Sequence, residues 1–140
     1  DIYNYKILFG LLILIWSSDS WAFVCGKLFG RHKLFERLSP NKTWEGFIGS
    51  IILTTTTGYV LSNNGFGLSQ IEWMILGVLT SISATLGDLF QSMLKRESNI
   101  KDSGNILPGH GGILDRFDSI LLCFPIFYLY LYYINPILNY

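Results

Sequence analysis

Three aspartates near two groups of basic residues are the side chains in this sequence most able to do chemistry. Asp115 and Asp118 are three residues apart, a spacing that places two side chains on one face of a helix. Asp88 lies near the end of an earlier hydrophobic run, where a carboxylate in hydrocarbon costs on the order of 2.5 kcal/mol or more. Carboxylate oxygens are ligands that Mg²⁺ prefers in proteins. The three aspartates therefore predict a site for one or two cations, Mg²⁺ among them, that bridges substrate phosphates.

Each acid in or beside a hydrophobic run also has a structural interpretation. Asp115 suits the first turn of a helix, where a negative charge interacts favourably with the helix dipole. Asp88, and Asp19 in the first hydrophobic run, could pair with a nearby base or with a serine of another helix. Because charged groups inside apolar segments are costly, a functional role is the default hypothesis for both.

A glycine-rich turn after Pro108 is the next candidate. Glycines allow positive φ, so this turn could direct several backbone N–H groups at an anion, and the N-terminus of the following helix adds its dipole. His110 could donate to a phosphate or be a solvated loop residue. The turn lacks the G-K-[ST] sequence of a P-loop. The glycines concerned are Gly109, Gly111 and Gly112.

Basic residues on both sides of this turn could neutralise phosphate groups. Alternatively, they could serve membrane topology or contact anionic lipids. On a helix, Ser92 and Lys95 follow Asp88 by four and seven residues and share its face. Acids, bases and an anion-binding turn together indicate phosphoryl or nucleotidyl transfer, on a lipid phosphate, a polyprenyl phosphate or a soluble nucleotide. The bases are Lys95, Arg96, Lys101 and Arg116.

The elements that position these groups follow from the composition. Of 140 residues, 50% are hydrophobic and 14% are charged, against about 25% charged in typical soluble domains. The formal net charge of zero gives no support for nucleic-acid binding. Four hydrophobic runs, each near the ~20 residues that span a bilayer, predict an all-α polytopic membrane protein. One catalytic domain, 1–140, is expected, with helices near 5–26, 45–62, 70–96 and 113–135, of which the second is the weakest because of its threonines.

The position of the bases predicts orientation. Basic residues lie between the first and second runs and between the third and fourth, whereas "NNGFGLSQ" between the second and third has none. The positive-inside bias then makes two basic loops cytoplasmic, with the active site facing the cytoplasm (at the inner or plasma membrane, if the source is bacterial). Trp44 and Trp73 would suit the membrane interfaces. Cys25 and Cys123 are expected to be small core residues, and the many small residues in the spans suggest a homodimer.

The segment "SMLKRESNIKDSGNILPGHGGILDRFD", residues 92–118, closely resembles the signature of the phosphatidate cytidylyltransferase (CDP-diacylglycerol synthase) family. A second block, "SDSWAFVCGKLFGRHKLFERLSPNKTWEG" at 18–46, is similar to the family's other recurring segment, with Asn41 where lysine is common. Family members usually carry additional N-terminal transmembrane helices, so this chain is expected to be the C-terminal catalytic portion. The fixed positions present in the first block are Ser92, Lys95, Arg96, Lys101, Asp102, Gly104, Leu107, Pro108, Gly109, His110, Gly111, Gly112, Asp115, Arg116 and Asp118.

The resemblance implies transfer of CMP from CTP to phosphatidic acid, which gives CDP-diacylglycerol and pyrophosphate. It implies CTP, phosphatidic acid and the lipid bilayer as partners, and Mg²⁺ as cofactor, with one or two cations at the site. The residues implied in catalysis are Asp88, Asp115, Asp118, Lys95 and Arg116, the three aspartates binding metal. Those implied in substrate binding are Ser92, Arg96, Lys101, Asp102, Gly109, His110, Gly111, Gly112, Asp19, Lys42 and Thr43.

Three other functions stay open at this point. A CTP-dependent kinase of a polyprenol or other lipid alcohol would use similar groups, but it would need a general base and would release CDP. An inactive fragment would bind CTP without turnover. An ion-conducting membrane protein, in which Asp19 and Asp88 carry ions, would show flux without nucleotide turnover.

Overall fold

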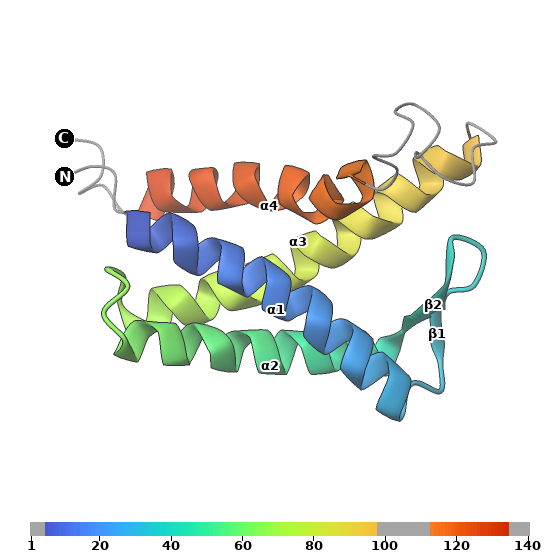
Figure 1. Ribbon diagram of the computed structural model, residues 1–140, viewed down its shortest axis with the longest axis horizontal. Coiled ribbons are helices and arrows are strands. Elements are labelled where there is room, and N and C mark those ends of the chain that lie inside the picture. Colours follow the sequence, from blue (N-terminus) through green and yellow to red (C-terminus); the bar gives the residue numbers. More distant parts are fainter. Residues whose placement is uncertain (1–4, 98–112, 135–140) are drawn as a thin grey trace.

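A computed structural model describes residues 5–97 and 113–134, and for Lys95, residues 113–118 and Ile134 it describes the backbone alone. Within these residues the chain forms four helices and one hairpin, so the expected all-α class with four helices is confirmed and the hairpin is an addition (Figure 1). The elements are α1 (Tyr5–Phe29), β1 (Lys33–Phe35), β2 (Ser39–Thr43), α2 (Trp44–Asn63), α3 (Gln70–Glu97) and α4 (Ile113–Ile134).

The four helices pack in sequence order and alternate in direction. α1 lies against α2, α2 against α3, and α3 against α4. The hairpin, the end of α3 and the start of α4 therefore lie towards one end of the bundle, whereas the connection between α2 and α3 lies at the other end (Figure 1). We call these the hairpin end and the loop end. The first basic segment forms the hairpin itself, and Arg96 lies near the end of α3 at the same end.

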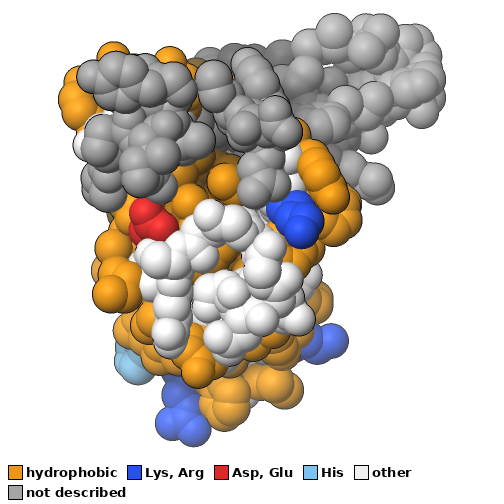
Figure 2. Space-filling model, turned by 90° about the vertical axis from the view of Figure 1, so that its left-hand side faces the viewer, with side chains coloured by type: hydrophobic (Ala, Val, Ile, Leu, Met, Phe, Trp, Pro, Cys, Tyr) orange, Lys and Arg blue, Asp and Glu red, His pale blue; other side chains and the backbone are white. Residues whose placement is uncertain are grey.

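Polar and apolar side chains are distributed as in a helix bundle that faces lipid. Large apolar residues are exposed on the helices, for example Trp16 (63%) and Tyr128 (68%). Serines and threonines are buried between helices, and the hydroxyls of Ser50 and Ser81 lie 2.5 Å apart across α2 and α3. Hydrophobic side chains border the loop end, which itself shows mostly uncharged surface (Figure 2). Interhelical hydroxyls and outward apolar residues are characteristic of membrane helices.

Length and hydropathy alone support fewer spans than the sequence predicted. Among the described residues, Tyr5–Phe29 and Gln70–Leu94 are long and apolar enough to cross a membrane. In α4 the apolar stretch, Ser119–Tyr133, is shorter, and α2 carries four consecutive threonines, three of which donate to the carbonyl four residues earlier. Two helices thus support membrane association, and four spans stay a proposal.

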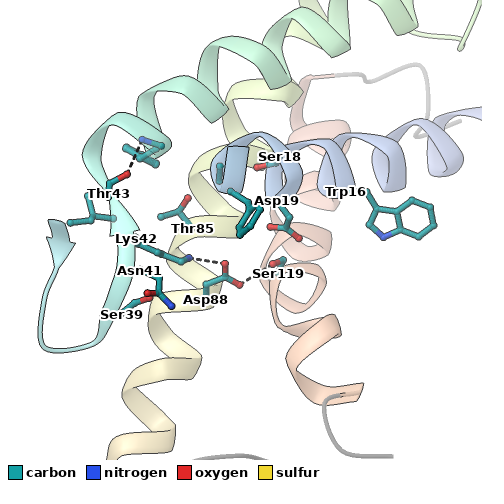
Figure 3. A pocket seen from close by; sticks show the side chains of 15 residues that line it. Trp16, Ser18, Asp19, Ser39, Asn41, Lys42, Thr43, Thr85, Asp88 and Ser119 are labelled. Atoms are coloured by element: carbon teal, nitrogen blue, oxygen red, sulfur yellow. Dashed lines mark hydrogen bonds and ion pairs between the residues drawn. The ribbon is translucent and has the colours of Figure 1, made fainter. Parts of the chain in front are cut away.

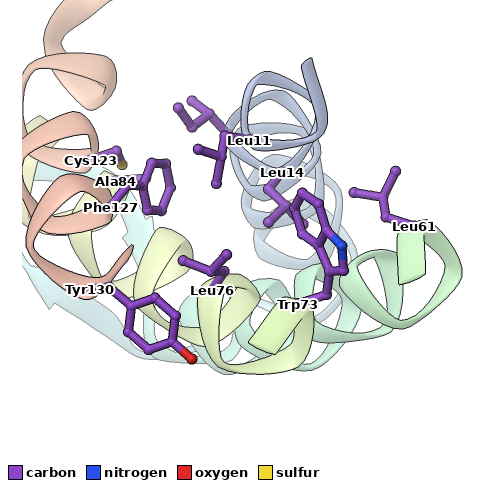
Figure 4. Close-up of a cluster of buried hydrophobic side chains, with 10 residues drawn as sticks. Leu11, Leu14, Leu61, Trp73, Leu76, Ala84, Cys123, Phe127 and Tyr130 are labelled. Atoms are coloured by element: carbon purple, nitrogen blue, oxygen red, sulfur yellow. The ribbon is translucent and has the colours of Figure 1, made fainter. Parts of the chain in front are cut away.

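Trp73, which was expected at a membrane interface, lies near the start of α3 and closes the core at the loop end. Its side chain is fully buried among leucines of α1, α2 and α3 (Figure 4). A Cβ added at Gly58 would collide with the Trp73 carbonyl oxygen, and one added at Gly10 would collide with the indole ring. Gly10 of α1 therefore leaves room for the indole, and Gly58 lets α2 approach the backbone of α3 closely. The two cysteines are buried and free, as expected.

The first basic segment is a hairpin and not the irregular loop that the sequence analysis assumed. Lys33 pairs with Thr43 and Phe35 with Ser39 in an antiparallel register. The Trp44 N–H donates to the His32 carbonyl at 3.0 Å and extends this pairing to the start of α2. The segment has none of the Asn-Gly or Asp-Gly turns that mark a hairpin, and it places a proline in the second strand. Local sequence signals therefore gave no indication of it.

Candidate functional site

A polar cavity of about 530 Å³ lies at the hairpin end, between α1, the hairpin, α2, α3 and α4. Figure 3 shows side chains from α1, the hairpin, α3 and α4 directed towards a common space. The polar residues that line it are Ser18, Asp19, Ser39, Asn41, Lys42, Thr43, Thr85, Asp88 and Ser119. Four segments that are distant in the sequence therefore contribute polar groups to one site.

Asp88 joins three of these elements through its two carboxylate oxygens. Lys42 of β2 donates from Nζ to Asp88 Oδ2 at 2.6 Å. Ser119 of α4 donates from Oγ to Asp88 Oδ1 at 3.1 Å (Figure 3). The Lys42 and Asp88 side chains are 26% and 29% exposed, so the pair is accessible from the cavity. These contacts match the structural interpretation of Asp88, a base and an interhelical serine, yet they place the pair where a phosphate could reach it.

The hairpin is fixed to α2 by two groups, and this attachment positions Lys42. Thr43 caps α2 by accepting a hydrogen bond from the Gly46 N–H at 3.2 Å, an arrangement that satisfies one unpaired donor of the first turn. Glu45 accepts from His32 Nδ1 at 2.7 Å and from the backbone N–H groups of Arg31 and His32, each at 3.2 Å. The hydrogen bond from the His32 ring is the main cause that lowers the pKa of the Glu45 carboxyl to about 2, and the backbone bonds add to it.

Of the residues proposed from the sequence, the structure brings four together. Asp19, Lys42, Thr43 and Asp88 all line the cavity. Ser92 and Arg96 lie further along α3 and are not among its described lining residues.

The remaining predicted residues are not described in full. The structure describes the backbone of Lys95 in α3 and of Asp115, Arg116 and Asp118 in the first two turns of α4. The predictions outside the described residues are Lys101, Asp102, Gly109, His110, Gly111 and Gly112.

Sequence analysis missed several lining residues that a helical-spacing argument could have found. Thr85 precedes Asp88 by three residues, and Ser119 follows Asp115 by four, so each is one turn from a residue that was singled out. Ser39 and Asn41 had no such signal, because their position depends on the hairpin.

The described donors suit a hard cation in type but do not by themselves complete a metal site. Asp19 and Asp88 line the same cavity, and within residues 5–97 and 119–133 no group of three His, Cys, Asp or Glu side chains could hold a metal ion. Mg²⁺ is commonly bound through one or two carboxylates together with waters and substrate phosphates. Oxygen donors of this type fit Mg²⁺, provided that Asp88 exchanges its contact with Lys42.

The chain is similar to a protein family and to several known proteins over most of its length. Residues 3–134 match the model of the family described as "Cytidylyltransferase family". The chain is 43% identical over 132 residues to the phosphatidate cytidylyltransferase of Bacillus subtilis (strain 168), covering 94% of this chain and 49% of that protein. The Haemophilus influenzae phosphatidate cytidylyltransferase is also 43% identical over 132 residues, which is 91% of this chain and 46% of that protein.

A staphylococcal relative gives the same result. The phosphatidate cytidylyltransferase of Staphylococcus haemolyticus is 46% identical over 121 residues, which is 86% of this chain and 46% of that protein. The chain thus spans about half the length of the curated relatives it matches.

Proposed function

Because the chain belongs to the cytidylyltransferase family, we propose that it carries the site at which CMP is transferred from CTP to phosphatidic acid. The products are CDP-diacylglycerol and pyrophosphate, and the pathway is phospholipid biosynthesis. The observation that supports this most is the polar cavity, which combines a lysine, two carboxylates and several hydroxyls at one end of an apolar helix bundle. A lipid phosphate and a water-soluble nucleotide can meet only where a polar site adjoins an apolar surface.

The reaction is an in-line substitution at phosphorus. An oxygen of the lipid phosphate attacks the α-phosphorus of CTP and forms a new P–O–P bond. The bond between the α-phosphorus and the oxygen that bridges to the β-phosphorus breaks, and its electron pair leaves with pyrophosphate. The lipid phosphate is already an anion, so the step needs charge neutralisation and positioning more than a general base.

Lys42 is the described residue best placed for this neutralisation. Its ammonium group lies in the cavity and contacts only one carboxylate oxygen of Asp88 among the interactions described for it. A phosphate oxygen that takes the place of that carboxylate makes a charge-assisted hydrogen bond of the same kind. Thr43 and Asp19 complete the wall of the cavity around the bound phosphates.

Asp88, Asp115 and Asp118 hold Mg²⁺, and a second cation when two are bound. When present, the metal neutralises negative charge on the CTP phosphates and orients them. Support for this assignment is the oxygen chemistry of the donors and the position of Asp115 and Asp118 in the helix that also contributes Ser119 to the cavity.

The other residues of the signature contact the anionic parts of the two substrates. Gly109, His110, Gly111 and Gly112 bind the departing pyrophosphate, and Ser92 and Asp102 help to hold the nucleotide. The bases that neutralise the triphosphate and the lipid phosphate are Lys95, Arg96, Lys101 and Arg116.

In the membrane, all four helices span the bilayer, and the hairpin end faces the cytoplasm. Support comes from the alternating direction of the helices and from the basic residues that adjoin the hairpin end. The many small residues in the spans also support a homodimer.

The test is Mg²⁺-dependent release of pyrophosphate from CTP by the complete protein, with and without phosphatidic acid. The wild type is expected to release pyrophosphate and form CDP-lipid only when the lipid is present, and Asp118→Asn is expected to lose this activity. Release that ignores the lipid, formation of CDP and a lipid phosphate instead, or an undiminished Asp118→Asn rate contradicts the proposal.

A further inference from the structure

A second cavity lies beside the first and is entirely apolar in its lining. It has a volume of about 400 Å³ and lies between Phe35 and Leu38 of the hairpin, the stretch of α3 from Leu86 to Met93, and Leu122 of α4. This volume is within the roughly 300–1,000 Å³ range of small-molecule sites. Several lining side chains are exposed, among them Phe35 at 49% and Phe90 at 53%. We call this cavity the apolar groove.

The apolar groove and the polar cavity share three walls. In the hairpin, Leu34 and Ser39 line the polar cavity, whereas the adjacent Phe35 and Leu38 line the apolar groove. Leu34 and Phe35 are successive residues of β1 and point to opposite faces, so this strand borders both spaces.

α3 and α4 also contribute residues to both spaces. Thr85 and Asp88 line the polar cavity and Leu86 and Leu89 the groove, while α4 contributes Ser119 to one and Leu122 to the other. A molecule with a phosphate in the polar cavity therefore has an apolar site within reach, lined by the same elements.

The surroundings of the groove are basic. Arg37 is next to Leu38 in the hairpin, and Arg96 follows Met93 by one turn of α3. Both are exposed, and neither forms an ion pair within the part of the chain that the structure describes, whereas Lys33 pairs with Glu36 at 3.6 Å. An apolar groove flanked by arginines complements an anionic lipid better than a neutral one.

Phe35 and Leu38 are the feature that a general lipid-facing surface does not explain. Both belong to the hairpin, residues 33–43. This segment is short, carries several charged residues and lies outside the helices. Apolar side chains in such a segment are left facing water unless something covers them.

We propose that the apolar groove binds an acyl chain of the same phospholipid whose phosphate occupies the polar cavity. This inference rests on the proposed function, because it identifies the lipid as the substrate. The groove then contributes to selection of long-chain phosphatidic acid over short-chain analogues.

The test compares chain-length dependence in two matched variants of the complete protein. Leu86→Trp fills the groove, and Leu121→Trp places the same ring at a leucine of similar exposure (66% against 54%) that does not line it. KM and kcat are measured with dioleoyl and dihexanoyl phosphatidate.

Leu86→Trp is expected to raise the KM for the dioleoyl substrate by about tenfold, the loss that corresponds to roughly two buried methylene groups. Its KM for the dihexanoyl substrate and for CTP, and all constants of Leu121→Trp, are expected to stay within about twofold.

If Leu86→Trp changes the KM for both lipids equally, or for neither, the proposal is overturned. Turnover of dihexanoyl phosphatidate in the same assay still supports the proposed function. A second measurement does not depend on turnover. Phosphatidate with a diazirine at the end of one acyl chain is photolysed with the wild type, and adducts are mapped by mass spectrometry. Adducts on the groove residues support the proposal. Adducts confined to other apolar surfaces overturn it. In a separate experiment, photo-leucine replaces Leu38, and crosslinks only to the protein's own chain, with none to lipid, also overturn the proposal.

Discussion

The two ends of the helix bundle use the same four helices in opposite ways. At the loop end, glycines on α1 and α2 let the helices close around Trp73 and leave it fully buried. At the hairpin end, the helices are joined through charged and hydroxyl groups around a cavity of about 530 Å³. One end is packed for stability, and the other leaves space for ligands. Substitutions at the two ends should therefore separate stability from activity.

The largest effect is expected at Asp88. Asp88→Asn keeps the size of the side chain but removes the charge opposite Lys42, and CDP-lipid formation should fall by about 10²–10³-fold, as for loss of one preorganised electrostatic group. Initial rates with CTP and phosphatidic acid measure this. Glu97→Gln removes a carboxylate from the exposed end of the same helix, and its rate should stay within about twofold. If the two variants lose activity equally, the effect of Asp88 is not local to the cavity.

At the packed end, Gly58→Leu should destabilise the fold. The new side chain would collide with the Trp73 backbone, and overpacking of this kind costs about 1–3 kcal/mol. Thermal unfolding in detergent measures the shift, with Val60→Leu, an exposed position in the same helix, as the control. A Gly58→Leu protein that unfolds like the control would show that the helices do not approach as closely as described.

The contrast between the ends also shows what sequence could predict. Four hydrophobic runs predicted four helices because apolar length is a property of each segment alone. The buried position of Trp73 was missed because it depends on Gly10 and Gly58, which lie on two other helices. For the same reason, sequence could identify Asp88 as costly inside a span, but it could not identify Lys42 and Ser119 as its partners.

The hairpin was the main structural omission. Its strands are held by Glu45, which lies beyond both strands in the sequence and accepts hydrogen bonds from His32 and Arg31. The contact between Glu45 at the start of α2 and His32 joins residues thirteen positions apart. Such a contact produces no periodic pattern in the amino-acid sequence. The family signature nevertheless pointed to Asp19, Lys42 and Thr43, which now lie around one cavity with Asp88.

A smaller effect is expected from the hydrogen bond between α4 and Asp88. Ser119→Ala removes the donor to Asp88 Oδ1, and one such bond contributes about 0.5–1.5 kcal/mol. The rate of CDP-lipid formation should fall by roughly two- to tenfold, the range to which that free energy corresponds. Ser92→Ala on α3 is also expected to lower the rate, through nucleotide binding. The informative control is Ser62→Ala, a half-buried serine near the loop end whose hydroxyl donates to the Tyr59 carbonyl of its own helix. A Ser119→Ala rate equal to that of Ser62→Ala contradicts a role for this contact.

The smallest effect, visible only in acid, concerns the attachment of the hairpin. The His32 hydrogen bond and the backbone N–H bonds lower the pKa of Glu45 from 4.5 to about 2, so the carboxylate stabilises the folded state above pH 4.5 and this contribution is lost as pH falls towards 2. Hydrogen exchange, corrected for intrinsic rates, should show protection of the Arg31 and His32 amides that declines as pH falls below 4.5. Glu45→Gln should give lower protection without this dependence, and an identical profile in both proteins excludes Glu45 as the cause.

The most direct test of the central claim compares one lysine from each end. Lys42→Met removes the ammonium group from the polar cavity, and Lys6→Met removes the same group from the start of α1, outside that cavity. The measurement is the initial rate of Mg²⁺-dependent CDP-lipid formation from CTP and phosphatidic acid by the complete protein, with melting temperatures as a check on folding. The account predicts that Lys42→Met loses about 10²-fold or more, whereas Lys6→Met stays near the wild-type rate. Equal rates for two folded variants would contradict the assignment of the cavity as the site of transfer.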